Sequence, residues 1–382
     1  MPLSYTIVAF SHLRWNFVYQ RPQHLLSRLA AKRPVFFIEE PELDRDGPVR
    51  WERSYPAPNV TVLRPRTPVR TLGFHADQIA ALTPLMGELA DELAGENLLA
   101  WLYTPMALPL ARELDPAVMV YDCMDELSLF LGAPPELLAH ETALLEAAEV
   151  MFTGGPSLYR AKQSRHPNVH CFASSVDAAH FSRARGSQEE AQADAQDQAG
   201  IPHPRLGFYG VIDERLDLGL IDSVAAARPD WHIVLVGPVV KIDPATLPRR
   251  PNIHYFGQRS YQELPGYLGG WDVCLLPFAR NDSTRFISPT KTLEYMAAEL
   301  PIVSTPITDV AEPYGDIVYL GATPEEFLIA CEAALGSTDE ERNRRATLMR
   351  KVLSGTSWDV TVSAMEKLLD EALKKNAVRA SA

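Results

Sequence analysis

Short apolar runs alternate with amphipathic stretches along the whole chain. Runs of this kind suit strands that are buried on both faces. Those in the first half are Tyr5–Phe10, Val35–Ile38, Val60–Leu63, Leu98–Leu102, Val118–Tyr121 and Val150–Thr153. Those in the second half are Arg205–Tyr209, His232–Val236, Ile253–Phe256, Val273–Leu276, Ile302–Ser304 and Ile317–Tyr319. Apolar residues at helical spacing predict helices between them, at 23–31, 135–148, 325–335 and 340–353 among others. This alternation predicts an α/β fold with parallel sheets and helices on both faces.

The chain divides near its middle. Its 382 residues are enough for two domains of ordinary size. The segment Gly186–Gly200 is rich in Gln, Ala, Asp and Glu and lacks the apolar content to pack, so it predicts an exposed linker or loop. From Trp358 onward, apolar residues at helical spacing predict a terminal helix. Two such doubly wound domains would form a cleft between the carboxyl ends of their strands, so the loops after strands are the places to look for chemistry.

The segment 281–305 has the strongest chemical signal. It predicts a polar loop, a helix and a buried strand, with Ser288 as the helix cap and Pro289 in the first turn. Lys291 falls in that turn, where its charge opposes the helix dipole. A helix N-terminus with a lysine suits an anion, and a diphosphate would relieve the clash. Glu294, one turn later, could accept hydrogen bonds from a sugar hydroxyl of the same ligand. The alternative is an i,i+3 ion pair on a solvated face.

The loop after the first strand, 11–24, is dense in aromatic and hydrogen-bonding side chains and contains no glycine. A plain βα connection is shorter and more polar. Three aromatic residues could form a platform for a sugar ring: Trp15, Phe17 and Tyr19. Four polar residues could bind hydroxyls or phosphate: His12, Arg21, Gln23 and His24. The alternative is a satellite core with Arg21 at the surface. We favour binding, because buried loops rarely hold so many polar groups without partners.

Acidic side chains follow the predicted strand at 118–121. Asp122, Asp125 and Glu126 fall where the carboxyl end of the sheet is expected. Asp122 or Asp125 could hold or deprotonate an acceptor hydroxyl. Acids at a helix start are also ordinary capping, so both interpretations stay open.

Three weaker signals lie at strand ends in the second half. Gly210 would let the backbone approach a diphosphate closely, and Arg215 could stabilise the leaving phosphate. The alternative is a simple turn with a surface pair between Glu214 and Arg215. Lys241 could reach the same phosphates, and the turn at Gln258 could hold a nucleobase. Together with the segment 281–305, these signals predict one nucleotide-diphosphate pocket. Neither a Walker sequence nor G-x-G-x-x-G occurs, so ATPase and dinucleotide functions are poorly supported.

Composition narrows the class of protein. The net charge of −13 argues against nucleic acid as a partner. The four cysteines form no CxxC pair, so neither a zinc site nor a disulfide framework is expected. The chain opens on a predicted strand without the pattern of a signal peptide, and it has no apolar run long enough for a membrane span. These features predict a cytoplasmic protein.

The chain resembles GT-B glycosyltransferases of the large retaining family that contains sucrose synthases and phosphatidylinositol mannosyltransferases. The resemblance covers most of the chain and is strongest from Phe208 to Val310. The run Ser288–Ala298 is similar to that family's donor-site helix, and Val176–Phe181 is similar to its segment before the linker. Three further segments look like a bacterial subgroup linked to cell-surface polysaccharides: Trp15–His24, Tyr121–Asp125 and Gly210–Arg215.

The resemblance implies two Rossmann-like domains facing a central cleft. An acceptor-binding domain would comprise 1–182 and a crossover helix at 358–382. A linker at 183–203 would lead to a donor-binding domain at 204–357. The implied reaction moves a sugar from a nucleotide diphosphate, of UDP or GDP type, to a saccharide or lipid-linked acceptor. No metal or other cofactor is implied, since the nucleotide sugar is a co-substrate. A lipid-linked acceptor would bring the protein to the inner face of the membrane.

The resemblance also implies roles for individual residues. Glu294 would bind the donor ribose, while cationic side chains and the Gly210–Val211 backbone would contact the diphosphate. The predicted donor-binding set is Gly210, Val211, Arg215, Lys241, Gln258, Ser288, Lys291 and Glu294. The predicted acceptor-binding set is His12, Trp15, Arg21, Gln23 and His24. The predicted catalytic groups are Asp122, Asp125, Arg215 and Lys291, of which the cations would stabilise the departing diphosphate. Retention would proceed by attack on the same face, without a protein nucleophile.

The sequence departs from the family pattern in three places. Phe286 stands where the first of the family's paired acids is expected, which leaves Asn281, Asp282 and Ser283 as candidates to contact the donor sugar. The family's Arg…Lys pair after the first C-terminal strand is reduced to Arg215. The usual Asn-Gly is replaced by Ser174-Ser175.

Two other functions fit the same residues. A sugar-nucleotide 2-epimerase would use Asp122, Asp125 and His12 as acid and base and would need no acceptor. An inactive module would bind sugar nucleotides or scaffold a polysaccharide complex, and the missing acid at Phe286 motivates that alternative.

Overall fold

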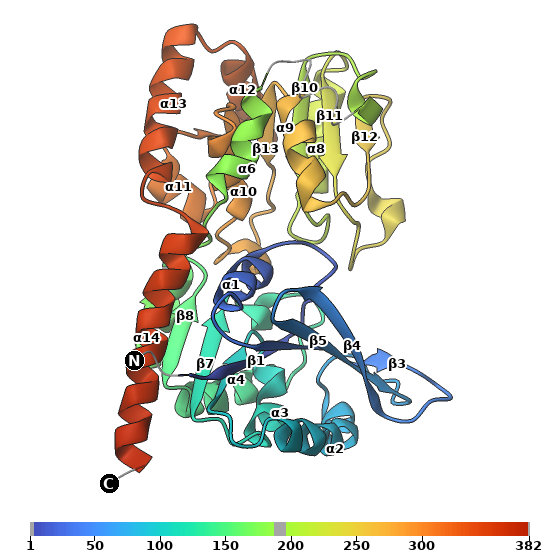
Figure 1. Ribbon diagram of the computed structural model, residues 1–382. Coiled ribbons are helices and arrows are strands. Elements are labelled where there is room, and N and C mark those ends of the chain that lie inside the picture. Colours follow the sequence, from blue (N-terminus) through green and yellow to red (C-terminus); the bar gives the residue numbers. More distant parts are fainter. Residues whose placement is uncertain (1–3, 187–195, 381–382) are drawn as a thin grey trace. The chain divides into compact units, whose positions relative to one another are not determined.

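Two compact units make up the protein. The structure is a computed structural model that describes residues 4–186 and 196–380. One unit combines Met1–Ala173 with Trp358–Ala382, and the other spans Ser174–Ser357. Each unit has one sheet, with helices packed on it (Figure 1). The predicted parallel α/β architecture is confirmed.

The first unit contains a nine-stranded sheet within its described residues. The strands are β1 (Thr6–Ser11), β2 (Val35–Glu39), β3 (Glu42–Leu43), β4 (Arg50–Ala57), β5 (Val60–Thr67), β6 (Leu98–Leu102), β7 (Val118–Cys123), β8 (Val150–Thr153) and β9 (Val169–Cys171). Their order is β3-β5-β2-β1-β6-β7-β8-β9, with parallel pairing throughout. β4 pairs with β5 and runs antiparallel. The α-helices of this unit are α1 (Arg21–Leu29), α2 (Ala76–Glu92), α3 (Leu108–Arg112), α4 (Leu137–Ala147), α5 (Pro156–Lys162) and α14 (Trp358–Ala380).

The second unit contains a six-stranded sheet within its described residues, in the order β12-β11-β10-β13-β14-β15. The strands are β10 (Arg205–Tyr209), β11 (His232–Val236), β12 (Ile253–Tyr255), β13 (Val273–Leu276), β14 (Ile302–Ser304) and β15 (Tyr319–Leu320). Every neighbouring pair is parallel. The α-helices among the described residues of this unit are α6 (Ala178–Ser182), α8 (Leu218–Ala227), α9 (Leu264–Gly269), α10 (Thr290–Ala297), α11 (Thr308–Tyr314), α12 (Pro324–Leu335) and α13 (Asp339–Leu353).

The predicted strands are present, except that the last one is shifted: Ile317 and Val318 precede β15, which begins at Tyr319. The others could be predicted because central parallel strands bury both faces and leave a continuous apolar signature. β1, for example, is buried at all six positions. β3, β4 and β9 were not predicted, and for β4 its exposure explains why. It pairs only at the edge, and most of its side chains are exposed, so its sequence carries no core-facing pattern.

The terminal helix α14 packs in the core of the first unit. Its buried apolar residues are Trp358, Val362, Met365, Leu369, Ala372 and Leu373. Glu366 on the same helix forms ion pairs with Lys32 at 2.8 Å and with Arg33 at 2.7 Å. The helical spacing predicted from Trp358 onward therefore corresponds to one buried face, flanked by ion pairs.

The predicted linker has a more complex structure than an exposed loop. Residues 187–195 lie outside the described residues. The end of the segment Gly186–Gly200 packs on the second unit, because the buried Gln198 side chain donates to the carbonyl of Tyr267 at 2.9 Å and accepts from Trp271 Nε1 at 3.2 Å. The expectation of exposure is therefore wrong at Gln198. Residues 174–182, which the sequence analysis assigned to the first domain, lie in the second unit.

Gly207, in the middle of β10, allows a test of how tightly the core of the second unit is packed. A Cβ at this position would lie 1.9 Å from a ring carbon of the buried Trp271. We expect Gly207→Ala to lower the free energy of unfolding by about 1–3 kcal/mol, because an overpacked indole has no room to shift. Urea denaturation of both proteins measures this. Gly219→Ala is the control, since a Cβ there meets an ordinary contact at 3.5 Å. Equal stability of the two variants would contradict the packing argument.

Candidate functional site

Two glycine turns meet at the carboxyl ends of β10 and β11. Gly210 has a φ of +143° and Gly237 a φ of +150°, which other residues rarely adopt. The Gly210 N–H donates to the Val236 carbonyl at 2.9 Å. A Cβ at Gly237 would lie 1.8 Å from the Gly210 carbonyl oxygen, so the two backbones approach too closely for a side chain. Gly210 therefore occupies the kind of turn that the sequence predicted at this strand end.

Lys291 lies against this turn. A Cβ at Gly210 would be 2.3 Å from Lys291 Cε and 3.2 Å from its Nζ, so the ammonium group is held beside the Gly210 backbone. Lys291 is the second residue of α10, whose N-terminus has no side-chain cap. The predicted capping by Ser288 is wrong, because Pro289 is extended, with a ψ of 121°, and the helix begins only at Thr290. A lysine, a glycine turn and an uncapped helix N-terminus thus lie together, which suits an anion.

Glu294 is buried in the next turn of α10, with 8% of its surface exposed. Its Oε2 accepts a hydrogen bond from the Tyr209 hydroxyl at 2.7 Å. Burial raises the pKa of Glu294, while the charge of Lys291 and the hydrogen bond from Tyr209 act in the opposite direction. The alternative of an ion pair on a solvated face is wrong, because this carboxyl group is inside the protein.

Arg215 is held by an acid that the sequence analysis missed. Its guanidinium group donates to Asp213 through Nε at 2.9 Å and through Nη2 at 2.6 Å. Asp213 is only 4% exposed, so this pair is more than a surface contact. The alternative of a pair between Glu214 and Arg215 is wrong. The spacing Asp-x-Arg within one turn was the available signal.

Asn281, one of the proposed substitutes for the missing acid, lies in the loop before α10, where its side chain caps a short helical turn. Asn281 accepts from the Thr284 N–H at 3.2 Å and from the Ser283 hydroxyl at 2.7 Å, and it donates to the Glu214 carbonyl at 3.3 Å. Neither carboxylate oxygen of Glu214 has a hydrogen-bond partner within the described residues. Phe286 lies under the guanidinium group of Arg285, 5.1 Å from the ring centre.

The remaining donor candidates are exposed or half-buried. Val211 precedes Ile212, whose N–H and carbonyl form hydrogen bonds with Pro238 at 2.9 Å and with Val240 at 3.1 Å. This pairing places the segment that leads into Lys241 beside the Gly210 turn. Gln258 is exposed after β12, which β11 separates from β10.

In the first unit, Asp122 and Arg21 form a buried ion pair at the carboxyl end of β7. Asp122 is 0% and Arg21 is 3% exposed. Arg21 Nη2 donates to Oδ1 at 2.8 Å, Nε lies 3.1 Å from both carboxylate oxygens, and Nη1 donates to the Phe172 carbonyl at 2.6 Å. The alternative that placed Arg21 at the surface is wrong. Because both oxygens of Asp122 are bound by a guanidinium group, the geometry favours a structural role over that of a base.

Asp125 lies in the half-buried loop that follows β7. The next residue, Glu126, forms an ion pair at 2.5 Å with Lys162, which is 2% exposed and also pairs with the buried Glu141 at 2.6 Å. This pairing fixes the loop beside Asp125. Asp125 is therefore the acid of this loop that we retain as a catalytic candidate.

The loop between β1 and α1 departs from the predicted sugar platform. The Trp15 ring is 7% exposed and packs edge-on against Phe37, with ring centres 5.1 Å apart. Gln23 is fully buried and donates to the Trp15 carbonyl at 2.7 Å. His24 stacks on Trp358 at 4.6 Å. These three side chains pack in the core in place of the predicted acceptor contacts. Tyr19, by contrast, is 40% exposed.

Comparisons with known proteins bear on this arrangement. Residues 203–337 match the family described as glycosyl transferases group 1. The chain is 26% identical over 299 residues to TuaH of Bacillus subtilis, which is named as a teichuronic acid biosynthesis glycosyltransferase, and 73% of each chain is covered.

Two solved structures show which fold the chain shares. Sucrose-phosphate synthase of Thermosynechococcus elongatus has a TM-score of 0.73 at 14% identity, over 97% of this chain and 100% of that one. HepE of Anabaena, in complex with UDP and glucose, has a TM-score of 0.67 at 13% identity, over 95% and 98%. The chain has the GT-B fold.

The described residues also bear on metal ions and membranes as possible partners. No group of three or more His, Cys, Asp or Glu side chains within residues 4–186 and 196–380 is arranged to hold a metal ion. In the same part of the chain, no helix combines the length and the apolar content that crossing a membrane requires.

A pH-dependent test addresses the contact between Tyr209 and Glu294. Loss of the tyrosine hydroxyl should raise the pKa of Glu294 further above its unfolded value. The ionised folded state then becomes less stable, and this penalty of the variant relative to wild type is lost as the pH falls through the raised folded pKa of Glu294. We expect Tyr209→Phe to cost about 1–3 kcal/mol at neutral pH and less at acid pH, as measured by thermal unfolding.

Tyr255→Phe is the matched control for this test, because Tyr255 donates to the uncharged Pro248 carbonyl at 3.1 Å. Its cost should not change with pH over the range in which carboxyl groups titrate. If the two variants showed the same pH dependence, Tyr209 would not be supporting a buried carboxylate.

Proposed function

We propose that this glycosyltransferase moves a sugar from a nucleotide-diphosphate donor to a saccharide or lipid-linked acceptor, with retention of configuration, in surface polysaccharide or glycolipid biosynthesis. The observation that carries the proposal is the juxtaposition of Lys291, Gly210 and Glu294 in the second unit. The name of TuaH supports the role in surface polysaccharides. The UDP of the HepE complex, and the UDP-2-fluoro glucose named for the Escherichia coli protein at a TM-score of 0.65, support a UDP donor.

Each group has a chemical task in the proposed reaction. The bond between the donor's anomeric carbon and its phosphate oxygen breaks, the acceptor oxygen forms a bond to the same carbon, and the acceptor's proton passes to an oxygen of the leaving diphosphate. Lys291 and the α10 N-terminus stabilise the charge that develops on the leaving diphosphate. Arg215, fixed by Asp213, and Lys241 add positive charge. Glu294 binds the ribose. The acceptor attacks on the face from which the diphosphate leaves, and Asp125 is the candidate that orients its hydroxyl.

We propose that the reaction needs no metal ion, because these cationic groups would meet the charge of the diphosphate. The epimerase alternative is not favoured, since the matches are to glycosyltransferases and Asp122 is bound by Arg21. An inactive scaffold would bind the nucleotide sugar without transfer, which the kinetic assays below would reveal.

Nucleotide binding tests the pocket directly. We expect UDP to raise the melting temperature of the wild-type protein more than GDP or dTDP does. Lys291→Ala should weaken UDP about 10- to 100-fold, because a charge-assisted hydrogen bond is lost. Lys351→Ala removes an exposed lysine from α13 of the same unit and should leave the shift unchanged. The absence of a shift with all three nucleotides in wild type would refute the proposed pocket.

Glu214 is our candidate for the group that replaces the missing acid. Its carboxylate has no partner within the described residues, and its backbone is tied to the loop before α10. We expect Glu214→Gln to weaken a UDP-sugar about tenfold while leaving UDP affinity unchanged, because only the sugar hydroxyls are affected. Calorimetric titration with both ligands measures the difference. Asp282→Asn tests the competing candidate: a selective loss there, with none for Glu214→Gln, would reassign the role.

A further inference from the structure

The loop between β1 and α1 is fastened by side chains that lie outside it. The buried hydroxyl of Ser11 at the end of β1 accepts from the Leu13 N–H at 2.9 Å. Gln23 of α1 donates to the carbonyls of Trp15 at 2.7 Å and Val18 at 3.1 Å. The third tie comes from Glu39 at the end of β2. Since the loop has no regular secondary structure between residues 12 and 20, these ties determine its conformation.

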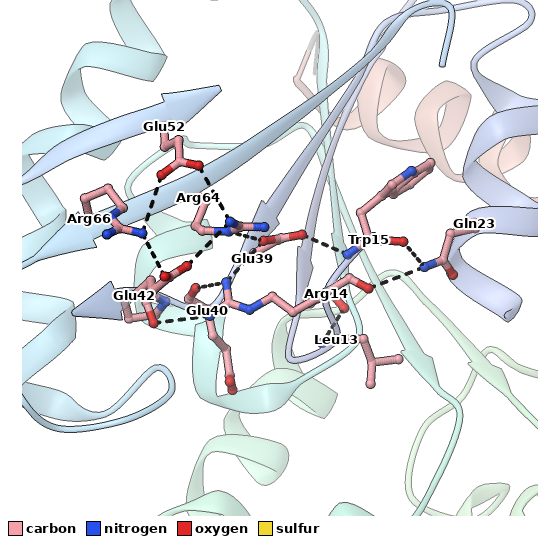
Figure 2. A network of polar contacts seen from close by, with 12 residues as sticks. Leu13, Arg14, Trp15, Gln23, Glu39, Glu40, Glu42, Glu52, Arg64 and Arg66 are labelled. Atoms are coloured by element: carbon pink, nitrogen blue, oxygen red, sulfur yellow. Dashed lines mark hydrogen bonds and ion pairs between the residues drawn. The ribbon is translucent and has the colours of Figure 1, made fainter. Parts of the chain in front are cut away.

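Glu39 is the buried centre of a polar network (Figure 2). Its side chain is 0% exposed. Oε1 accepts from the Trp15 N–H at 2.8 Å, and Oε2 accepts from Arg14 Nη1 at 3.1 Å and from Arg64 Nε at 2.7 Å. Two of its three donors belong to the loop, and the third belongs to β5. The sequence analysis did not single out Glu39.

The charge of Glu39 is compensated by this geometry. A buried carboxylate is tolerated only when cations and hydrogen bonds replace its water. Arg14 and Arg64 supply that compensation. The network continues through Arg64 and Arg66 to Glu52, with ion pairs of 3.6 and 3.5 Å. Glu52 is half exposed and has no hydrogen bond or ion pair with the loop among the described residues, so it shares the network without holding the loop.

Trp15 connects Glu39 to the rest of the loop. Its N–H binds Glu39, its carbonyl accepts from Gln23, and its ring packs on Phe37. The backbone is thereby fixed on both sides of one residue. Tyr19, four residues later, is 40% exposed and meets His24 edge-on at 4.6 Å. The side chains that remain exposed on the loop, Asn16 and Tyr19 among them, are an amide and an aromatic ring, which suit the hydroxyls and the C–H face of a sugar.

We propose that Glu39 is a positioning residue for acceptor recognition, which holds the β1–α1 loop in the conformation that presents Tyr19 to the acceptor sugar. This inference rests on the proposed function, and it adds a residue that acts through the Trp15 backbone without touching the substrate. The donor site in the second unit should not depend on it.

Glu39→Gln tests the proposal, because it keeps the shape of the side chain but turns an amide NH2 group toward an arginine or the Trp15 N–H. Hydrogen exchange of peptides covering residues 12–20 reports the hold on the loop. Steady-state kinetics with UDP-glucose and a panel of p-nitrophenyl hexosides, N-acetylhexosaminides and hexuronides report recognition. We expect loop exchange and the acceptor KM to rise about tenfold. The donor KM and the UDP-induced thermal shift should stay within about twofold of wild type.

Glu52→Gln is the matched control from the same network and should leave both loop exchange and acceptor KM unchanged. If the Glu39→Gln variant does not fold, Arg14→Ala is the second test. It removes the arginine with which the loop binds Glu39, at a partly exposed position, and it should raise both loop exchange and the acceptor KM.

Three results would overturn the inference: wild-type loop exchange in the variant, a raised exchange with an unchanged acceptor KM, or an equal rise in donor and acceptor KM. Failure of the proposed function looks different, because the wild-type protein would then transfer sugar to no member of the panel, and the inference would fall with it. A wild-type protein that transfers sugar, beside a Glu39→Gln variant with the same acceptor KM, would overturn the inference alone.

Discussion

Close backbone approach at Gly210 is the constraint on which the second unit depends. A side chain at Gly237 would collide with the Gly210 carbonyl oxygen, and a side chain at Gly210 would collide with Lys291. The missing Cβ at Gly210 leaves room for Lys291 beside the turn, and the residue before Gly210, Tyr209, donates a hydrogen bond to Glu294 on the same helix as Lys291. One pair of glycine turns therefore aligns the end of β10 with the start of α10. A backbone without a Cβ atom beside a lysine suits a phosphate group, because a side chain at Gly210 would take up the space that the phosphate needs.

The first unit is organised differently, by buried carboxylates, of which two lie at strand ends and one lies on α4. Asp122 is held by Arg21, Glu39 by Arg14 and Arg64, and Glu141 by Lys162 and Arg165. Removing one partner of such a pair leaves an uncompensated charge inside the protein, so these contacts fix their loops firmly. In the second unit, Lys291 lies beside the Gly210 turn. In the first unit, the cations pair with buried carboxylates and thereby fix the conformation of loops. The difference agrees with the division proposed here between donor binding and acceptor presentation.

Much of the fold could be predicted from the sequence, and less of the site. The parallel strands have continuous apolar runs because both of their faces are buried, so their positions were readable. β4 was not, since an exposed edge strand lacks that pattern. Lys291, Glu294 and Gly210 were predicted as one group because strand ends of a parallel sheet lie at one edge. Trp15, Gln23 and His24 were assigned to an acceptor, because the sequence shows polar and aromatic side chains but not the partners that bury them.

The sequence by itself determined the α/β class, the parallel strands and the residue types that could meet a diphosphate, since hydrophobic period and local turn chemistry are properties of neighbouring residues. Only the tertiary structure decided which charges are paired. Asp213 with Arg215, Arg21 with Asp122 and Glu39 with the β1–α1 loop depend on long-range packing or on the shape of a turn. A buried charge and an exposed one have the same letter in the sequence. The solvent that the fold removes around each of them decides whether it binds a ligand or holds the protein together.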